Sequence, residues 1–250
     1  MQSSFVSLDI ENAVGILTFS TPDHNALPSS ILSDLENKII EAGKMSNLRV
    51  LILKSGGDRT FCAGASFKEL IAISNQDEGK SFFMGFAKVI LAMRSCPLPI
   101  IARIQGKAVG GGVGIAAAAD YCFASKFASV KLSELTIGIG PFVIEPAVTR
   151  KIGVSASSQM TFNATAFYDA SWAQAQGLYA EVYNSVEELD LAIKDLANNL
   201  ASYNPEATKQ AKRIFWEGTD HWSSFLEERA SISGNLVLSK FTKEKLKSYA

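Results

Sequence analysis

The chain has 250 residues, of which 47% are hydrophobic and 20% are charged, and its formal net charge is -1. This length suits one large domain or a domain with an appendage, and the composition is that of an ordinary globular protein. The near-balance of charge argues against nucleic acid as a partner, because nucleic-acid binding normally needs a clustered basic excess. No apolar run reaches the roughly eighteen residues of a membrane span, and the opening residues lack the pattern of a secretory signal. We therefore expect no membrane partner and a cytoplasmic location.

Cysteine and histidine usage excludes two kinds of site. The three cysteines, Cys62, Cys96 and Cys122, are odd in number and unevenly spaced. That usage favours small buried thiols in a reducing compartment over a disulfide framework or a metal site. The two histidines, His24 and His221, are too far apart in the sequence to predict a metal ligand set. We expect no bound metal.

The N-terminal segment changes from strand to helix periodicity. Residues 5–20 contain two short β-type runs and predict a hairpin. The next segment has helical spacing, with Leu32, Leu35, Ile39 and Ile40 predicted to share the buried face of one helix.

Strands and helices continue to alternate along the middle of the chain. Residues 49–55 form a compact aliphatic run, typical of a strand buried on both faces, and residues 98–106 predict another strand. Between them, residues 78–95 have apolar side chains at helical spacing. Short strands are predicted at 121–125 and 129–133.

The C-terminal part of the sequence is mostly helical. Ser185 and Glu188 form a capping-box pattern, and Asn204 followed by Pro205 is typical of a helix start. The order of elements predicts an α/β core followed by a smaller helical region, with the boundary near residue 195.

The stretch AVGGGVGIAAAAD, residues 108–120, raises the question of what lies so close to this backbone. It matches neither the P-loop nor the dinucleotide fingerprint, because the required lysine-hydroxyl pair and third glycine are missing. Two interpretations remain. A helix starting near Gly111 offers unpaired N–H groups to a ligand oxygen, which would stabilise negative charge developing there. Alternatively, the small residues let the helix pack tightly against a neighbour.

A second stretch of small residues favours the first interpretation. TFCAGAS, residues 60–66, also follows a predicted strand and precedes a helix start. Two such turns together can supply two N–H donors to one oxygen, which is the arrangement that an enzyme forming an enolate requires.

The segments FCAGASFKEL, GKAVGGGVGIAAAADYCFA and LSELTIGIGP, in this order and spacing, resemble the crotonase superfamily of enoyl-CoA hydratases and isomerases. The resemblance implies a crotonase (ClpP/crotonase-like) fold of stacked ββα units, here residues 1–195. It also implies a C-terminal helical region, residues 196–250, that forms a homotrimer or a dimer of trimers. The substrate would be an acyl-CoA thioester, with coenzyme A as part of the substrate and no separate cofactor.

The resemblance also assigns roles to single residues. The backbone N–H groups of Ala65 and Gly111 match the family's two donors to the thioester oxygen. The positions that match the family's coenzyme A site are His24, Ala26, Leu27, Ala63 and Lys68.

The catalytic acids depart from the hydratase pattern. Typical hydratases of the family use two glutamates, of which the first position is held here by Gly114 and the second matches Glu134. Moving a double bond from the 3 to the 2 position needs one base, whereas hydration needs a water to be activated as well as a proton delivered. The single glutamate therefore favours 3-enoyl to 2-enoyl isomerisation, and a base working near neutral pH requires Glu134 to have a raised pKa.

Three other residues have open or structural interpretations. Glu145 is either a second acid or a charge in the first turn of a helix. As a second acid, it would make the protein an enoyl-CoA hydratase or dehydratase, for example on a branched substrate such as methylglutaconyl-CoA. A third possibility is a non-catalytic relative that only binds acyl-CoA. Asp120 is predicted to be a structural anchor, and Cys62 a packing residue.

Overall fold

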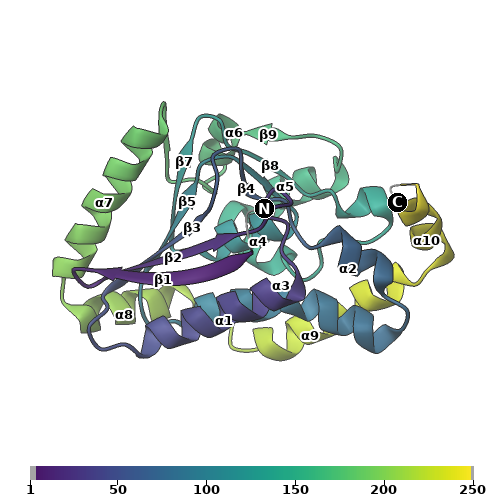
Figure 1. The fold of residues 1–250 in the computed structure, drawn as a ribbon, viewed down its shortest axis with the longest axis horizontal. Helices are drawn as coiled ribbons and strands as arrows, with labels where there is room; N and C mark the ends of the chain where they lie inside the picture. The colour runs from purple at the N-terminus through teal and green to yellow at the C-terminus, as the bar shows by residue number, and fades with distance from the viewer. Residues whose placement is uncertain (1–3, 249–250) are drawn as a thin grey trace.

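The computed structural model describes residues 4–248 and arranges them in two sheets covered by helices (Figure 1). Within this range the larger sheet has six strands in the order β1-β2-β3-β5-β7-β10. These strands are β1 (Phe5–Glu11), β2 (Val14–Ser20), β3 (Val50–Ser55), β5 (Ile100–Ile104), β7 (Tyr121–Ser125) and β10 (Glu181–Tyr183). This α/β architecture confirms the predicted fold class.

The predicted hairpin is confirmed. Strands β1 and β2 pair antiparallel up to the pair Glu11 and Val14, while the other neighbours in the larger sheet run parallel. The two turn residues, Asn12 and Ala13, have φ angles of 46° and 68°. Two successive left-handed residues make the tight turn whose twist matches that of the flanking strands.

The smaller sheet positions the candidate site, and two of its strands are not predicted from the sequence. Its order is β4-β6-β8-β9, formed by β4 (Thr60–Cys62), β6 (Lys107–Val109), β8 (Ser129–Lys131) and β9 (Tyr168–Asp169). Strands of two or three residues are too short to show periodicity, so β4 and β6 were expected to be loop and turn. Because β4 and β6 pair parallel, the chain leaves both at the same edge of the sheet.

Helices cover both sheets. They are α1 (Ser29–Lys44), α2 (Phe67–Ala72), α3 (Gln76–Ser95), α4 (Gly111–Ala118), the 3-10 turn η1 (Glu134–Ile137), α5 (Glu145–Phe162), α6 (Ala170–Ala175), α7 (Val186–Ser202), α8 (Pro205–Phe215), α9 (Trp222–Val237) and α10 (Lys240–Lys247). In Figure 1, α1, α3 and α9 lie below the larger sheet. Helix α7, at the left, packs on a face of this sheet, against β2, β3, β5, β7 and β10. None of the described helices is both long and apolar enough to cross a lipid bilayer.

One predicted core residue of α1 is exposed. Leu32, Leu35 and Ile39 are buried as expected, but Ile40 keeps 39% of its surface exposed. Successive helix residues are rotated by about 100°, so Ile40 lies beside the buried face rather than on it. The prediction for Ile40 was wrong.

The predicted helix starts in the C-terminal part are confirmed. Ser185 Oγ accepts a hydrogen bond of 3.1 Å from the N–H of Glu188, and Asn204 Oδ1 accepts one of 2.9 Å from the N–H of Glu206. Residue 195, the expected boundary, lies inside α7. The division of the chain there stays a prediction.

Asp120 is the anchor that its sequence position predicted. Its carboxylate accepts a hydrogen bond of 2.8 Å from the N–H of Ile100 and lies 2.8 Å from Lys212 Nζ on α8. Lys212 is only 5% exposed and also donates to the carbonyl of Leu98. The pair therefore ties the C-terminal helices to the start of β5.

This buried pair gives a first expected result. Asp120→Ala leaves the Lys212 ammonium buried without its counter-charge, which costs about 3 kcal/mol of the free energy of unfolding. The exposed pair of Lys38 and Glu41 serves as control, since its loss costs about 1 kcal/mol or less. Urea unfolding of Asp120→Ala and Glu41→Ala measures both. Equal losses would contradict the anchoring role.

Candidate active site

Two glycine-containing turns meet at the edge of the smaller sheet. Gly64, after β4, has φ +93°, and Gly110, after β6, has φ +52°. A Cβ added to Gly64 would lie 3.2 Å from the carbonyl oxygen of Val109 and 3.9 Å from the backbone nitrogen of Gly111. The turn that carries Ala65 therefore touches the turn that starts α4.

Neighbouring hydrogen bonds leave two N–H groups available there. The N–H of Leu27 donates to Gly64 O, and the N–H of Ser66 donates to Leu27 O, so a parallel bridge fixes the backbone on either side of Ala65. Within residues 4–248, the N–H groups of Ala65 and Gly111 have no hydrogen-bond acceptor. Gly111 is the first residue of α4, where the helix dipole also favours negative charge. The pair fits an oxyanion hole.

Glu134 faces these turns from η1. A Cβ on Gly110 would lie 2.9 Å from Glu134 Oε1. Glu134 Oε2 is buried, and none of the described residues hydrogen-bonds to it. Burial raises the pKa of Glu134 from 4.5 to about 7, against the opposing effect of the N–H groups of Glu134 and Ser133. A carboxyl group with this pKa can take up and return a proton near neutral pH.

The raised pKa predicts a pH profile. A base must be ionised to accept a proton, so kcat/KM is expected to rise about tenfold per pH unit below the pKa of Glu134 and to level off above it. Because burial raises that pKa to about 7, the midpoint is expected near neutrality. The initial rate at low substrate concentration, measured from pH 5 to 9, checks this. A midpoint at the ordinary glutamate pKa would contradict the assignment.

The glycine run serves both of the roles that the sequence left open. Besides facing Glu134, it packs tightly. A Cβ on Gly111 would lie 2.3 Å from the Phe86 ring, and one on Gly112 would lie 2.7 Å from Cys62 O. A Cβ on Gly114 would lie 2.6 Å from Ile144.

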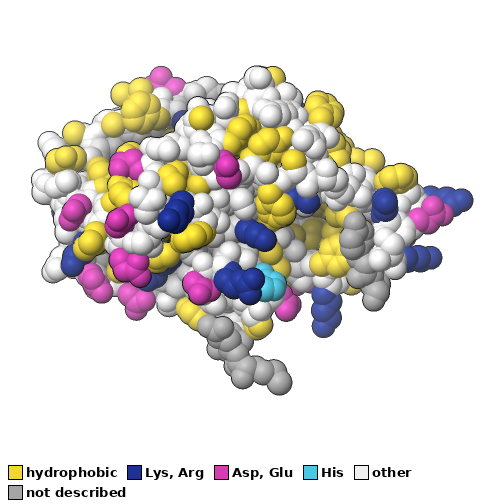
Figure 2. Space-filling model, turned by 90° about the horizontal axis from the view of Figure 1, so that it is seen from above, with side chains coloured by type: hydrophobic (Ala, Val, Ile, Leu, Met, Phe, Trp, Pro, Cys, Tyr) yellow, Lys and Arg dark blue, Asp and Glu magenta, His cyan; other side chains and the backbone are white. Residues whose placement is uncertain are grey.

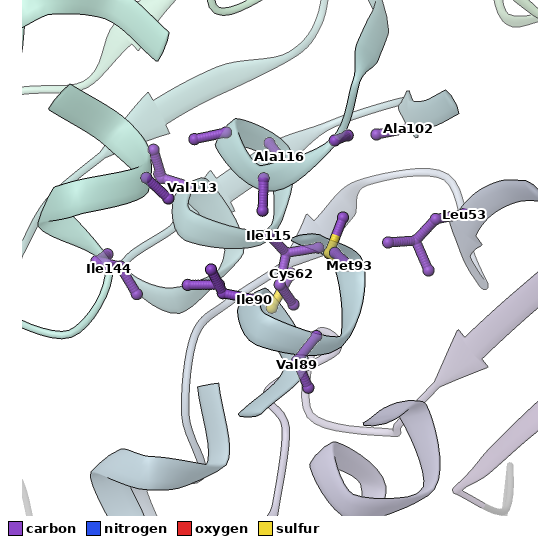
Figure 3. Close-up of a cluster of buried hydrophobic side chains, with 14 of the residues drawn as sticks. Leu53, Cys62, Val89, Ile90, Met93, Ala102, Val113, Ile115, Ala116 and Ile144 are labelled. Atoms are coloured by element: carbon purple, nitrogen blue, oxygen red, sulfur yellow. The ribbon is translucent and has the colours of Figure 1, made fainter. Parts of the chain in front are cut away.

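Cys62 is a packing residue, as expected. Figure 3 shows its side chain close to those of Ile90 and Met93, and it is fully buried. Burial raises the pKa of the Cys62 thiol to about 12, so it stays protonated and unreactive at neutral pH.

The two turns and Glu134 line one cavity of about 360 Å³. Most of the wall is apolar, which suits the hydrocarbon part of a ligand. Helix α3 contributes Phe82, Phe83 and Phe86, and the segment after η1 contributes Val143 and Ile144. The three phenylalanines lie in the helix that the sequence predicts for residues 78–95.

Glu145 does not line this cavity. It begins α5, and its carboxylate accepts a hydrogen bond from Thr149 Oγ1 in the same helix. The preceding residue, Ile144, lines the cavity instead and lies against Gly114. An aliphatic side chain therefore occupies the space into which a side chain at position 114 would project.

Three of the five residues expected to bind coenzyme A line one of two hollows. Ala63 lines the same cavity as Glu134. Ala26 and Lys68 line a second hollow of about 570 Å³, which shares Phe67 with the first. Leu27 is completely buried and both of its backbone polar groups are bonded, so it supports the Ala65 turn.

His24 is exposed and borders neither hollow, although its φ of +52° shapes the loop before Ala26. On the face shown in Figure 2, cationic and anionic side chains are interspersed, without one large basic patch. No group of three or more His, Cys, Asp or Glu side chains in residues 4–248 is placed to hold a metal ion.

Comparison of the sequence and the structure with known proteins shows the family to which the chain belongs. A sequence model described as enoyl-CoA hydratase/isomerase matches residues 9–248. A short-chain-enoyl-CoA hydratase of Clostridium acetobutylicum is 31% identical over 220 residues, which are 87% of this chain and 83% of that protein. A peroxisomal Delta(3,5)-Delta(2,4)-dienoyl-CoA isomerase of Arabidopsis thaliana is 28% identical, over 82% of this chain and 77% of that protein.

Further relatives and structures agree with this placement. The human mitochondrial methylglutaconyl-CoA hydratase is 30% identical over 78% of this chain, which spans 58% of that protein. The crystal structure of an enoyl-CoA hydratase from Bacillus halodurans superposes with a TM-score of 0.90, covering 98% of this chain and 100% of the other at 20% identity, a likeness of fold. The chain belongs to the enoyl-CoA hydratase/isomerase family, the crotonase superfamily, whose fold it has.

Proposed function

We propose that the protein is an enoyl-CoA isomerase that moves a double bond from the 3 to the 2 position of an acyl-CoA thioester. One observation carries the proposal: among the described residues, Glu134 supplies the one carboxyl group of the cavity, and it faces the N–H groups of Ala65 and Gly111. A single base beside an oxyanion hole is what a proton shift needs.

The reaction follows from that arrangement. The Glu134 carboxylate removes a proton from C2 of the 3-enoyl thioester, and the electrons of the broken C–H bond delocalise into the carbonyl. The resulting dienolate oxygen is held by the N–H groups of Ala65 and Gly111. Glu134 then returns the proton to C4, which forms the double bond between C2 and C3 and restores the carbonyl. No other reactant is consumed.

Hydration is the second candidate, favoured by the names of several relatives. The relatives named hydratase include those from Clostridium acetobutylicum and human mitochondria. In this chain a hydratase would need Glu145 as second acid, and the carboxylate of Glu145 bonds to Thr149 outside the cavity. Ile144 fills the space beside Gly114, where a first glutamate would project. We therefore place isomerisation first.

A spectroscopic assay with linear and branched 2-enoyl- and 3-enoyl-CoAs tests the proposal. The isomerase converts 3-enoyl-CoA to the conjugated 2-enoyl form, Glu134→Gln abolishes this, and Glu145→Gln retains it. Hydration of 2-enoyl-CoA that both variants stop would establish the hydratase instead. Tight acyl-CoA binding without any turnover would establish a non-catalytic relative.

We also propose a cytoplasmic homo-oligomer, a trimer or a dimer of trimers. Its support is the family resemblance together with large apolar side chains exposed on α5 and α8. Val154, Phe162 and Phe215 keep 72%, 81% and 71% of their surfaces exposed. Light scattering coupled to size-exclusion chromatography measures the state, and a monomer at working concentration would contradict it.

A further inference from the structure

The catalytic cavity contains a second unsatisfied polar group besides Glu134. Within residues 4–248, four buried side-chain polar atoms lack a hydrogen-bond partner: Gln105 Oε1, Glu134 Oε2, Tyr179 OH and Ser233 Oγ. Of these residues, Glu134 and Ser233 line the same cavity, and the other two do not. Ser233 is 0% exposed.

Close packing of two helices brings Ser233 to the cavity wall. Ser233 lies on α9, and a Cβ on the next residue, Gly234, would be 2.7 Å from the backbone of Lys80 on α3. The helices therefore touch with almost no side chain between them. Phe82 and Phe83 of α3 line the same cavity as Ser233.

An unpartnered hydroxyl in such surroundings is unfavourable. A buried donor or acceptor without a partner loses its hydration and gains nothing in return. The hydroxyl of Thr136, which also lines the cavity, is satisfied within the chain by donating to Ser133 O. Ser233 has no such bond, so a group in the cavity is left to supply it.

The charges of the cavity decide which kind of group fits. Of residues 4–248, those that line the cavity include one carboxyl group, Glu134, and one cation, Lys131, whose ammonium lies over the Phe167 ring. No described cationic side chain of α3 or α9 lines the cavity beside Ser233. A carboxylate on the ligand would be buried there without a counter-charge, which is strongly unfavourable. An uncharged oxygen meets the hydroxyl without this cost.

We infer that Ser233 selects acyl groups that carry an uncharged oxygen, a hydroxyl or a carbonyl, away from the thioester. The inference rests on the proposed function, because it assigns the apolar part of the cavity to the acyl chain. The hydroxyl can accept from a substrate hydroxyl or donate to a substrate carbonyl. This role could not be predicted from the sequence, because Ser233 belongs to no motif.

The test compares kcat/KM for two 3-enoyl-CoAs of equal chain length, one plain and one with a keto or hydroxyl group near the chain end. The wild-type protein is expected to favour the oxygen-bearing substrate by about tenfold, the effect of one buried hydrogen bond. Ser233→Ala is expected to lower kcat/KM for the oxygen-bearing substrate by about tenfold relative to the plain substrate, which removes the preference. Ser231→Ala is the matched control, because that hydroxyl lies on the same helix and bonds to Glu227 O.

The outcomes separate this inference from the function on which it rests. Turnover of the plain substrate with no preference, or a preference that survives in Ser233→Ala, overturns the inference and leaves the isomerase standing. If Ser233→Ala lowers kcat/KM equally for both substrates, the inference is also overturned. The hydroxyl would then contact a part that the two substrates share, such as coenzyme A. Turnover of neither substrate by the wild-type protein would reject the proposed function itself.

Discussion

Glu134→Gln is expected to lower kcat for 3-enoyl-CoA isomerisation by about a thousandfold, with little change in KM. The substitution keeps the size of the side chain but removes the group that takes up and returns the proton, and general bases contribute about 10²- to 10⁴-fold. Steady-state kinetics at about pH 8, where the wild-type carboxylate is ionised, measures the loss. Glu145→Gln, which changes a carboxylate outside the cavity, is the matched control and is expected to retain activity.

The same variant is expected to be more stable than the wild-type protein at about pH 8. The pKa of Glu134 is raised from 4.5 to about 7, so between these values the folded protein holds a proton that the unfolded chain has released. The wild-type free energy of unfolding therefore falls as pH rises through this window, by at most about 3 kcal/mol. Glutamine does not titrate and avoids the loss. At about pH 4 the difference between the two proteins should vanish.

The kinetic and stability measurements on Glu134→Gln together distinguish loss of the base from failure to fold. A variant that is inactive because it fails to fold would unfold at lower urea concentration than the wild-type protein. The expected Glu134→Gln variant is inactive and unfolds at higher urea concentration at about pH 8. An active variant, or an inactive one without added stability at that pH, would contradict the assignment of Glu134 as a buried base.

Gly110→Ala is expected to abolish most of the activity at a moderate cost in stability. Gly110 has φ +52° and ψ -118°, a backbone conformation that residues with a Cβ rarely adopt. The added methyl group would also lie 2.9 Å from Glu134 Oε1, so the carboxyl group and the start of α4 must both shift. Displacement of a base and an oxyanion donor together is expected to lower kcat by about a hundredfold or more.

Gly218→Ala is the control that separates these effects. Gly218 also has a positive φ, +79°, but a Cβ there would meet nothing within 4 Å. Both variants are expected to lose about 1 kcal/mol or more of the free energy of unfolding from backbone strain. Only Gly110→Ala is expected to lose kcat. Equal kinetic effects in the two variants would show that the contact with Glu134 is not what matters at Gly110.

Much of the fold could be predicted from local patterns. The hairpin of residues 5–20, the strand at 49–55 and the helix start near Gly111 all agree with the structure. Periodicity, turn residues and capping residues encode such elements within a few neighbouring positions. Ile40 is the exception, because a helix face is set by rotation about the axis as well as by spacing.

Features that depend on contacts distant in sequence could not be read in this way. Strands β4 and β6 have three residues each and exist because they pair with one another. Packing between remote segments places Gly114 against Ile144 and brings Ser233 of α9 into the cavity lining. The resemblance to a family indicated Ala65, Gly111 and Glu134, but only the structure shows the cavity that joins them.

Isotope transfer tests the single-base account most directly. The protein is given a 3-enoyl-CoA in which deuterium replaces both hydrogens on C2, and the product is analysed by mass spectrometry and NMR. The account predicts 2-enoyl-CoA in which a measurable share of the deuterium has moved to C4, because one buried carboxyl group removes and returns it. A 3-hydroxyacyl-CoA product, or a 2-enoyl product with no deuterium at C4, would contradict the account.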